Sequence, residues 1–286
     1  MAVSDHLRTY RQAAWLGWQM ESNWTRPGLF LIYSVIRPIA ATLILVLMYL
    51  IIKQDVTSDP ALFAYVYLGA AFYMFVAQVL FGITYIIHED REHYQTLRHV
   101  YIAPISIYAY VLGRATSKVV LTALSVLISL TFGVVVLGLP LDLLRVNWLL
   151  LGSAMVLGLA CIGAIGIALA GVSLLTAKHS AGINEGIAGA FYLFCGAVFP
   201  LTILPAWGQA IGLAIPVTYW LEEVRRAIYP GGGIEELSGL QAYSDLTILG
   251  FLALSTVLFL ALSVVIFRYA DRVARRKGKV DMITSY

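Results

Sequence analysis

The sequence contains little charge and little cysteine. Charged residues make up only 12% of its 286 positions, whereas hydrophobic residues make up 60% and the mean hydropathy is +0.83. This balance excludes an ordinary soluble domain. The two cysteines, Cys161 and Cys195, fall inside apolar stretches where a thiol behaves as a small hydrophobe, so we expect no disulfide. Residues 1–28 lack the apolar core and the cleavage site of a signal peptide, so we expect the mature protein to keep them.

What the sequence does have is six long apolar stretches. They cover Leu29–Ile52, Ala61–Ile87, Ile107–Leu139, Trp148–Leu175, Ile183–Leu204 and Leu246–Phe267. Each stretch is long enough for the ~20 helical residues that cross a hydrocarbon core of ~30 Å. We therefore predict an all-α, polytopic integral membrane protein with six transmembrane helices in residues 29–268. An N-terminal interfacial segment, residues 1–28, precedes this domain, and a basic tail, residues 269–286, follows it.

Basic side chains are concentrated in alternate gaps between these stretches. If the N-terminus is cytoplasmic, 15 of the 19 Lys and Arg residues lie inside, and only Lys53, Arg145, Arg225 and Arg226 lie outside. Because Lys and Arg favour the cytoplasmic side, we predict a multi-pass protein of the cell (plasma or inner) membrane with both termini cytoplasmic. A seventh span at Pro200–Trp220 would place the basic tail outside, against this count. The tail itself is typical of a topology anchor and could also touch anionic headgroups.

Residues 4–23 show an amphipathic pattern. Apolar side chains recur at helical spacing at Leu7, Tyr10, Ala14, Trp15 and Trp18, with Arg8, Arg11, Gln12 and Gln19 on the other side and Trp24 following. The pattern predicts a helix that lies in the cytoplasmic interface and ends at Arg26-Pro27-Gly28. An ordinary helix packed on a neighbouring domain is the alternative.

The segment between the fifth and sixth stretches differs from the other outer loops. Ala206–Trp220 is mostly apolar, but it is only about fifteen residues long and contains Pro216, which favours a re-entrant or interfacial segment over a crossing. A short amphipathic helix with Glu222, Glu223, Arg225 and Arg226 is expected next. Short re-entrant helices are therefore predicted in residues 200–230, before the last span.

The inner loop at residues 88–106 combines charge with an apolar side. Six consecutive ionisable residues, His88–His93, precede the apolar residues Leu97, Val100, Ile102 and Ile105. We expect a short helix with one charged and one apolar face, presented to the cytoplasm, where it is suited to docking on a soluble partner. A solvated helical linker is the alternative.

Two groups of residues carry a resemblance to a known family. The first comprises Glu89–Glu92, Thr96, Leu97, Ala103–Ser106, Gly113 and Arg114, and the second comprises Phe199–Leu201, Leu204–Trp207, Pro216–Tyr219, Glu223, Arg225 and Arg226. In this order and placement they resemble the permeases of type-2 ATP-binding-cassette (ABC) exporters over nearly the whole chain. One departure is that many members have Gly followed by Thr-Leu-Glu where this chain has Gln95, Thr96, Leu97 and Arg98.

The resemblance implies a half-transporter that pairs with a second permease copy, as a homodimer, or with a paralogue, and with two ABC ATPase subunits. It assigns ATPase coupling to Glu89, Asp90, Arg91, Glu92, Thr96, Leu97, Pro104 and Ile105. It assigns an outer gate to Pro200, Pro205, Trp207, Pro216, Glu223 and Arg225. ATP and Mg would be bound by the ATPase, so this chain is expected to need no cofactor, metal or catalytic residue of its own. Membrane lipids are expected partners, and nucleic acid is not.

Two apparent nucleotide motifs do not change this interpretation. Leu237–Gln241 reads LSGLQ, close to the ATPase signature LSGGQ, yet it lies in a predicted outer loop with no phosphate-binding loop upstream. Gly113–Lys118 lacks the GK[ST] ending that places a lysine and a hydroxyl on the phosphates and Mg²⁺. We therefore expect no ATP hydrolysis by this chain alone.

Few polar side chains fall within the spans, and these are the candidates for a substrate path. They are Tyr33, Arg37, Tyr73, Gln78, Asn184 and Glu185. Arg37 either snorkels to the inner headgroups or faces a water-filled vestibule. The predicted substrate is a drug, a lipid or another amphipathic molecule moved outward.

Two other classes of protein stay open. An integral membrane enzyme acting on lipid or prenyl substrates would need His88, Glu92 and His93 as its polar cluster, although their spacing is not HExxH. An ion-coupled secondary carrier would normally need an ionisable residue deep in a span, and the central span residues offer almost none.

Overall fold

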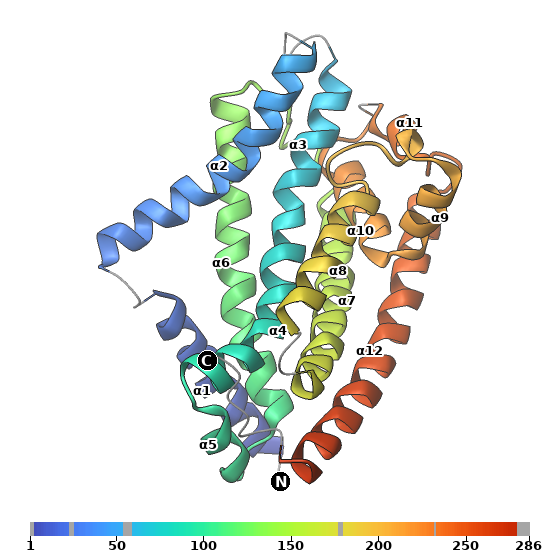
Figure 1. The fold of residues 1–286 in the computed structure, drawn as a ribbon. Coiled ribbons are helices and arrows are strands. Elements are labelled where there is room, and N and C mark those ends of the chain that lie inside the picture. The colour runs from blue at the N-terminus through green and yellow to red at the C-terminus, as the bar shows by residue number, and fades with distance from the viewer. Residues whose placement is uncertain (1–2, 23–25, 54–58, 177–179, 232, 279–286) are drawn as a thin grey trace.

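The computed structural model describes residues 3–22, 26–53, 59–176, 180–231 and 233–278. Trp24, Lys178 and Lys279, which entered the predictions above, lie outside these ranges. Throughout the described residues the regular structure is helical, with no strand (Figure 1). The all-α prediction is confirmed for this part of the chain.

The helices follow one another along a long bundle (Figure 1). Their bounds are α1 Val3–Ser22, α2 Pro27–Lys53, α3 Pro60–Phe75, η1 Val76–Leu80, α4 Phe81–His88, η2 Glu89–His93, α5 Leu97–Ile102, α6 Ile107–Val135, α7 Trp148–Leu175, α8 Ser180–Phe194, η3 Leu201–Ile203, α9 Ala206–Ala214, α10 Pro216–Ile228, α11 Ile234–Ser238 and α12 Asp245–Arg276. The elements α3, η1, α4 and η2 are consecutive turns of one long helix, in which η1 and η2 are π-helical.

Within the described residues, five helices are long and apolar enough to cross a membrane. They are Gly28–Ile51, Pro60–His93, Ile107–Val135, Trp148–Leu175 and Asp245–Arg276, which correspond to five of the six predicted spans. In the predicted fifth span the helix α8 has only 15 residues before the chain bends at Cys195. Such a helix is about 22 Å long, short of the ~30 Å hydrocarbon core. The count of six spans therefore stays a prediction.

Small residues on α7 allow its neighbours to approach closely. A Cβ added to Gly171 would lie 3.1 Å from the Phe267 Cα of α12, and one added to Gly166 would lie 3.0 Å from the Leu80 carbonyl oxygen. Within a membrane the hydrophobic effect does not drive helices together, so they associate by close packing, which small residues allow because the two backbones can approach each other. α7 thus lies between α12 and the long helix that includes α4.

The first helix, α1, packs against α6 with one side and is exposed on the other. Gly17 and Ala13 face α6, and at Gly17 an added Cβ would lie 3.2 Å from the Arg114 Cα. The opposite side exposes Leu7 and Trp15, at 68% and 64% of their surface. The buried side of α1 thus carries Thr9, Ala13 and Gly17, whereas Arg8 and Trp15, predicted on opposite sides, are both exposed. The predicted division into an apolar and a polar side is therefore not the one that packing produces. α1 lies at the same end of the molecule as α5 (Figure 1).

The opposite end of the molecule holds the short helices α9, α10 and α11 (Figure 1). The interval 200–220 is divided into η3, α9 and the start of α10, with an extended residue at Ile215 before the break at Pro216. The alternative of a seventh span at Pro200–Trp220 is wrong, because no continuous helix occupies it. Whether these short helices re-enter the membrane stays a prediction.

Candidate functional site

The acidic residues of η2 point into the protein. Asp90 is fully buried, and its carboxylate accepts hydrogen bonds from the Arg114 guanidinium and, at 2.9 Å, from the Tyr110 hydroxyl, both on α6. Arg114 also pairs with Glu89 at 3.2 Å. We call Glu89, Asp90, Tyr110 and Arg114 the η2–α6 network. The bonds between its two halves join residues 20 to 25 positions apart along the sequence, so the network ties the inner loop to a membrane-crossing helix.

The neighbouring charge pair reaches a second helix. Arg91 is buried, pairs with Glu92 at 3.0 Å and donates to the Ser173 carbonyl oxygen near the end of α7 at 3.4 Å. The π-helical turn, in which the Tyr94 amide donates to the Glu89 carbonyl oxygen at 2.8 Å, continues the long helix through these residues. The expected short helix with a cytoplasmic charged face is therefore not formed, because most of this charge is satisfied internally.

The exposed part of the inner loop is α5 and the turns around it. Leu97 is buried and anchors the helix, whereas Arg98, His99, Ile102 and Pro104 are exposed, Ile102 to 76%. We call these four exposed residues the α5 face. Ile105 is half-buried and so is Thr96. Sequence reasoning missed Arg98, His99 and Ile102 as surface residues because the denser charge of residues 88–93 drew the assignment there.

A single unusual backbone conformation separates η2 from α5. Gln95 has φ of 52°, in the left-handed region that glycine adopts at little cost. This is the position at which the sequence departs from glycine in the resemblance described above. The turn geometry thus explains why a glycine suits this place, and Gln95 adopts the same conformation at some cost.

Three of the predicted path residues line one small cavity. The cavity has a volume of about 110 Å³ and is lined by Glu21, Phe30, Tyr33, Ser34, Arg37, Pro38, Gln78, Leu121, Leu124 and Ser125. We call it the α2 pocket. Gln78 reaches it from η1, and π-helical turns of this kind are frequent at functional sites. The structure thereby brings Tyr33, Arg37 and Gln78 together from helices that the sequence left unconnected.

A charged residue such as Arg37 within a membrane-crossing helix costs free energy of insertion. Arg37 is exposed, and it lies ten residues after Pro27, about 15 Å along α2 at the helical rise. A charge near the centre of a transmembrane helix costs roughly 2.5–3.5 kcal/mol on insertion scales, and such residues mark functional pathways. Arg37 lines the α2 pocket, and whether it faces a water-filled vestibule or snorkels to the headgroups stays a prediction.

The other predicted path residues form a separate group. The Tyr73 hydroxyl donates to the Ala188 carbonyl oxygen of α8 at 2.9 Å, and its ring lies 5.0 Å from that of Tyr192. Asn184 is buried and Glu185 is exposed, both on α8. Tyr73 thus joins α3 to α8, and none of these three residues is among those that line the α2 pocket.

At the other end, Arg225 of α10 is buried and joins two segments of the chain. We call its contacts the Arg225 latch. Its guanidinium donates to the carbonyl oxygens of Tyr65 at 3.1 Å, Gly196 at 2.6 Å and Ala197 at 3.4 Å, and it lies 3.7 Å from the centre of the Tyr65 ring. These contacts hold the bend after α8 against α3. Gly196 has φ of +71°, so the bend itself requires a residue without a side chain.

Two further ionisable groups of α10 differ sharply. Arg226 pairs with Glu222 at 2.8 Å and with Asp245 at 3.1 Å. Glu223 is fully buried, and neither of its carboxylate oxygens has a hydrogen-bond partner among the described residues. Burial, followed by the charge of Asp245, raises the pKa of Glu223 to about 8. The protonated form of Glu223 is therefore favoured at pH 7.

The remaining predicted gate residues split by exposure. Pro200 and Pro216 are buried, and Pro205 and Trp207 are exposed. Sequence reasoning missed Trp220, which is fully buried between α3 and α7 with its ring 6.3 Å from Phe72 and directly against Gly158. An indole following a helix-starting proline was the available signal, but nothing in the sequence named its partner.

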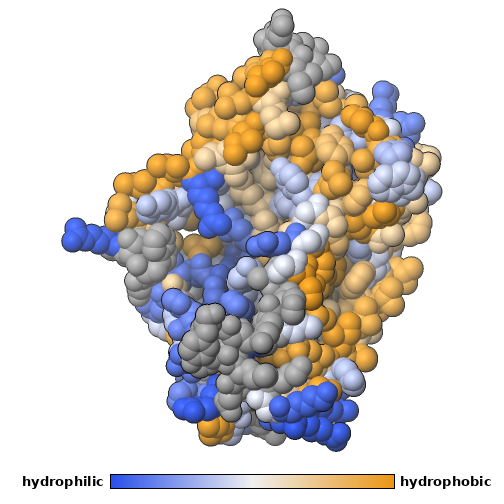
Figure 2. Space-filling view, viewed as in Figure 1, coloured by the Kyte–Doolittle hydropathy of each residue, from blue (hydrophilic) through white to orange (hydrophobic). Residues whose placement is uncertain are grey.

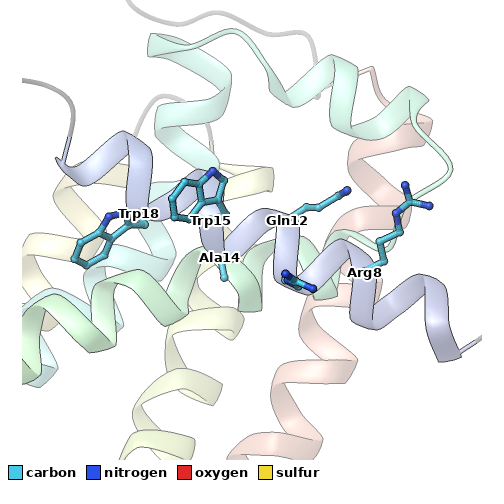
Figure 3. A pocket seen from close by; sticks show the side chains of 6 residues that line it. Arg8, Gln12, Ala14, Trp15 and Trp18 are labelled. Atoms are coloured by element: carbon cyan, nitrogen blue, oxygen red, sulfur yellow. The ribbon is translucent and has the colours of Figure 1, made fainter.

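The exposed side of α1 carries basic and aromatic residues together. An open cavity of about 780 Å³ is lined by Arg8, Arg11, Gln12, Ala14, Trp15 and Trp18. Figure 3 shows Arg8, Gln12 and Trp15 following one another along the same side of the helix. Guanidinium and indole groups suit the headgroup region of a membrane, and the interfacial position of this helix stays a prediction.

The polar cluster that a membrane enzyme would need is not assembled. His88 lies against Tyr85, with ring centres 5.8 Å apart, whereas His93 is exposed beside Tyr94. In the parts of the chain that the structure describes, no three His, Cys, Asp or Glu residues come together to hold a metal ion. His88 and His93 therefore belong to separate aromatic contacts in the described structure.

The chain matches the model of a known protein family. The model of the ABC-2 type transporter family matches residues 12–229, more than half of the chain. The matched range extends from α1 to α10 and includes the η2–α6 network, the α2 pocket and the Arg225 latch. No curated protein matches the chain.

Proposed function

The chain belongs to the ABC-2 type transporter family, and from this premise we propose that it is the permease subunit of an exporter. As a multi-pass membrane protein of this family it is a transport permease, and the family implies association with an ABC ATPase. We propose further that it moves a drug, a lipid or another amphipathic substrate outward. In this proposal the ATP is hydrolysed by the separate ATPase subunit.

The observation that carries the proposal is the η2–α6 network beside the exposed α5 face. A partner that displaces α5 would act on η2, and the buried pairs of Asp90 with Arg114 and of Arg91 with Ser173 connect η2 to α6 and α7. Buried ion pairs resist separation, because an unpaired charge left inside costs several kcal/mol. Movement at the inner loop is therefore transmitted to the spans rather than absorbed in the loop.

The proposed orientation places α1 and α5 on the cytoplasmic side. Six crossings then follow if α8 and the bend after it complete the fifth, and both termini are cytoplasmic. The bias of 15 basic residues among 19 supports this orientation in the plasma or inner membrane. The short helices α9 to α11 would then close the outer side, and Arg225 would have to release at least one carbonyl oxygen for that side to open.

A second permease copy or a paralogue completes the proposed transporter. α2, α6 and α12 expose much of their apolar surface in the single chain, which suits contact with lipid or with a second subunit. The proposed assembly is two permeases with two ATPase subunits.

Co-purification with the ATPase tests the proposal. An ATPase subunit carrying a phosphate-binding loop and an LSGGQ motif, encoded beside this chain, should co-purify with it from membranes. Replacing Arg98 by Glu together with Ile102 by Ala should reduce its recovery at least tenfold, because both side chains belong to the α5 face. Replacing Gln241 by Glu, an exposed change at the other end, is the control. Equal recovery with both variants would contradict docking at α5.

A further inference from the structure

The α2 pocket is a polar cavity beside an apolar span. Its hydrogen-bonding groups come from α2, η1 and α6, namely Ser34, Gln78 and Ser125, and Arg37 supplies the charge. Figure 2 shows hydrophilic surface extending behind the N-terminal half of α2, between two apolar surfaces. An opening of this kind gives a polar group access from the side of the bundle.

The charges in the pocket leave one positive group available. Glu21 also lines the cavity, but its carboxylate forms an ion pair with Lys118 of α6. Arg37 makes no ion pair with any residue that the structure describes. The acid in the pocket is thus already neutralised, and a guanidinium is a strong partner for a phosphate or a carboxylate.

The size of the pocket limits which part of a ligand can enter it. A volume of about 110 Å³ accommodates a small polar group and excludes an amphiphile with its chains. Beside it, Leu29, Ile32 and Ile36 expose between 44% and 57% of their surface on α2. Acyl chains of a molecule whose headgroup entered the pocket would therefore lie along α2 in the hydrocarbon region.

We propose that the α2 pocket binds the anionic headgroup of an amphiphile entering from the inner side, with Arg37 holding its phosphate or carboxylate. The Gln78 amide orients that headgroup by hydrogen bonds, and the Ser125 hydroxyl, which donates to the Leu121 carbonyl oxygen at 3.0 Å, joins it by turning from that bond. The identification of this amphiphile as the transported substrate rests on the proposed function. Its binding to the pocket does not.

The binding test uses two probes that share one fluorescent acyl chain, one ending in phosphate and the other in phosphocholine. The purified protein in phosphatidylcholine nanodiscs should bind the phosphate probe at least tenfold more tightly. Arg37→Gln should abolish this preference, and Arg37→Lys should retain part of it. Arg26→Gln, at the start of the same helix and exposed, is the matched control and should keep the preference.

A second variant keeps the test valid if Arg37→Gln disturbs the fold. Gln78→Ala with Ser125→Ala should weaken the phosphate probe about threefold to tenfold and leave the phosphocholine probe unchanged. An unaltered preference in Arg37→Gln, or an equal loss in Arg26→Gln, would overturn the pocket assignment, because the latter indicates attraction by surface charge alone.

Export separates a substrate site from a resident lipid site. The permease–ATPase complex in proteoliposomes should move the phosphate probe with ATP, and Arg37→Gln should reduce that rate at least tenfold. Normal export by Arg37→Gln would overturn the substrate assignment. If the wild-type complex exports neither probe, the proposed function fails, whereas the nanodisc measurement still decides whether the pocket binds anions.

Discussion

Removing the charge of Asp90 should destabilise the protein far more than removing the charge of an exposed partner. In Asp90→Asn the side chain keeps its shape, and the amide oxygen can still accept the Tyr110 hydrogen bond. Arg114, which is 2% exposed, loses its main counter-charge. Breaking a buried pair by removing one partner costs about 3–5 kcal/mol. We expect the lower end, about 3 kcal/mol, because Glu89 remains 3.2 Å from Arg114.

The control is an ion pair of the same chemistry in water. Asp142 and Arg145 pair at 3.3 Å with 51% and 78% of their side chains exposed. Exposed pairs contribute about 0–1 kcal/mol, so Asp142→Asn should change little. With a shift of about 2–4 °C per kcal/mol for a chain of this size class, Asp90→Asn should lower the Tm by about 6–12 °C.

The assay is thermal unfolding of the purified protein in one detergent, followed by tryptophan fluorescence. Asp90→Asn and Asp142→Asn are measured in the same buffer as the wild-type protein. A Tm for Asp90→Asn within 2 °C of the wild-type value would refute the buried network. Equal Tm shifts in the two variants would contradict the structure, in which the Asp90 pair is buried and the Asp142 pair is exposed.

Three further predictions concern other parts of the molecule. Gly158→Ala places a methyl group on the Trp220 indole and should cost about 1–3 kcal/mol, measured by the same unfolding assay; an unchanged Tm would mean that this contact is absent. Because Glu223 is protonated in the fold and has an ordinary pKa when unfolded, wild-type stability should fall from about pH 5 to pH 8 and then level off. Glu223→Gln should flatten that fall, and a curve parallel to the wild type would argue against it. Cysteine at Gln241 should react with a membrane-impermeant reagent in intact cells and cysteine at Arg98 should not; the reverse pattern would invert the orientation.

Much of the helical bundle could be predicted from the sequence, because a membrane span can be recognised from the length and hydropathy of an apolar stretch alone. Five of the six predicted spans coincide with long apolar helices. The fifth was harder, since apolar content does not show where a helix bends. There the chain turns after Phe194 through Gly196, and the bend depends on Arg225 donating from 29 residues further along. That partner is a property of the fold.

The inner loop shows the same limit. The charge of residues 88–93 is visible in the sequence, but its direction is decided by Arg114 and Tyr110 on another helix. An exposed charged face and a buried network have the same composition, so the sequence favoured docking by residues that the structure buries. The path residues were found by their rarity within spans, but the sequence did not show that Gln78, in the π-helical turn η1, lines the same pocket as Arg37.

The most direct test of the central claim is ATP-driven export by the reconstituted complex. This chain and its ATPase, in proteoliposomes with the ATPase sites outside, should carry a labelled amphiphile into the lumen when ATP is added. A complex whose ATPase phosphate-binding lysine is replaced should not. We predict accumulation that needs both subunits and hydrolysable ATP. Movement without ATP, or ATP hydrolysis that the amphiphile never stimulates and that moves nothing, would contradict it.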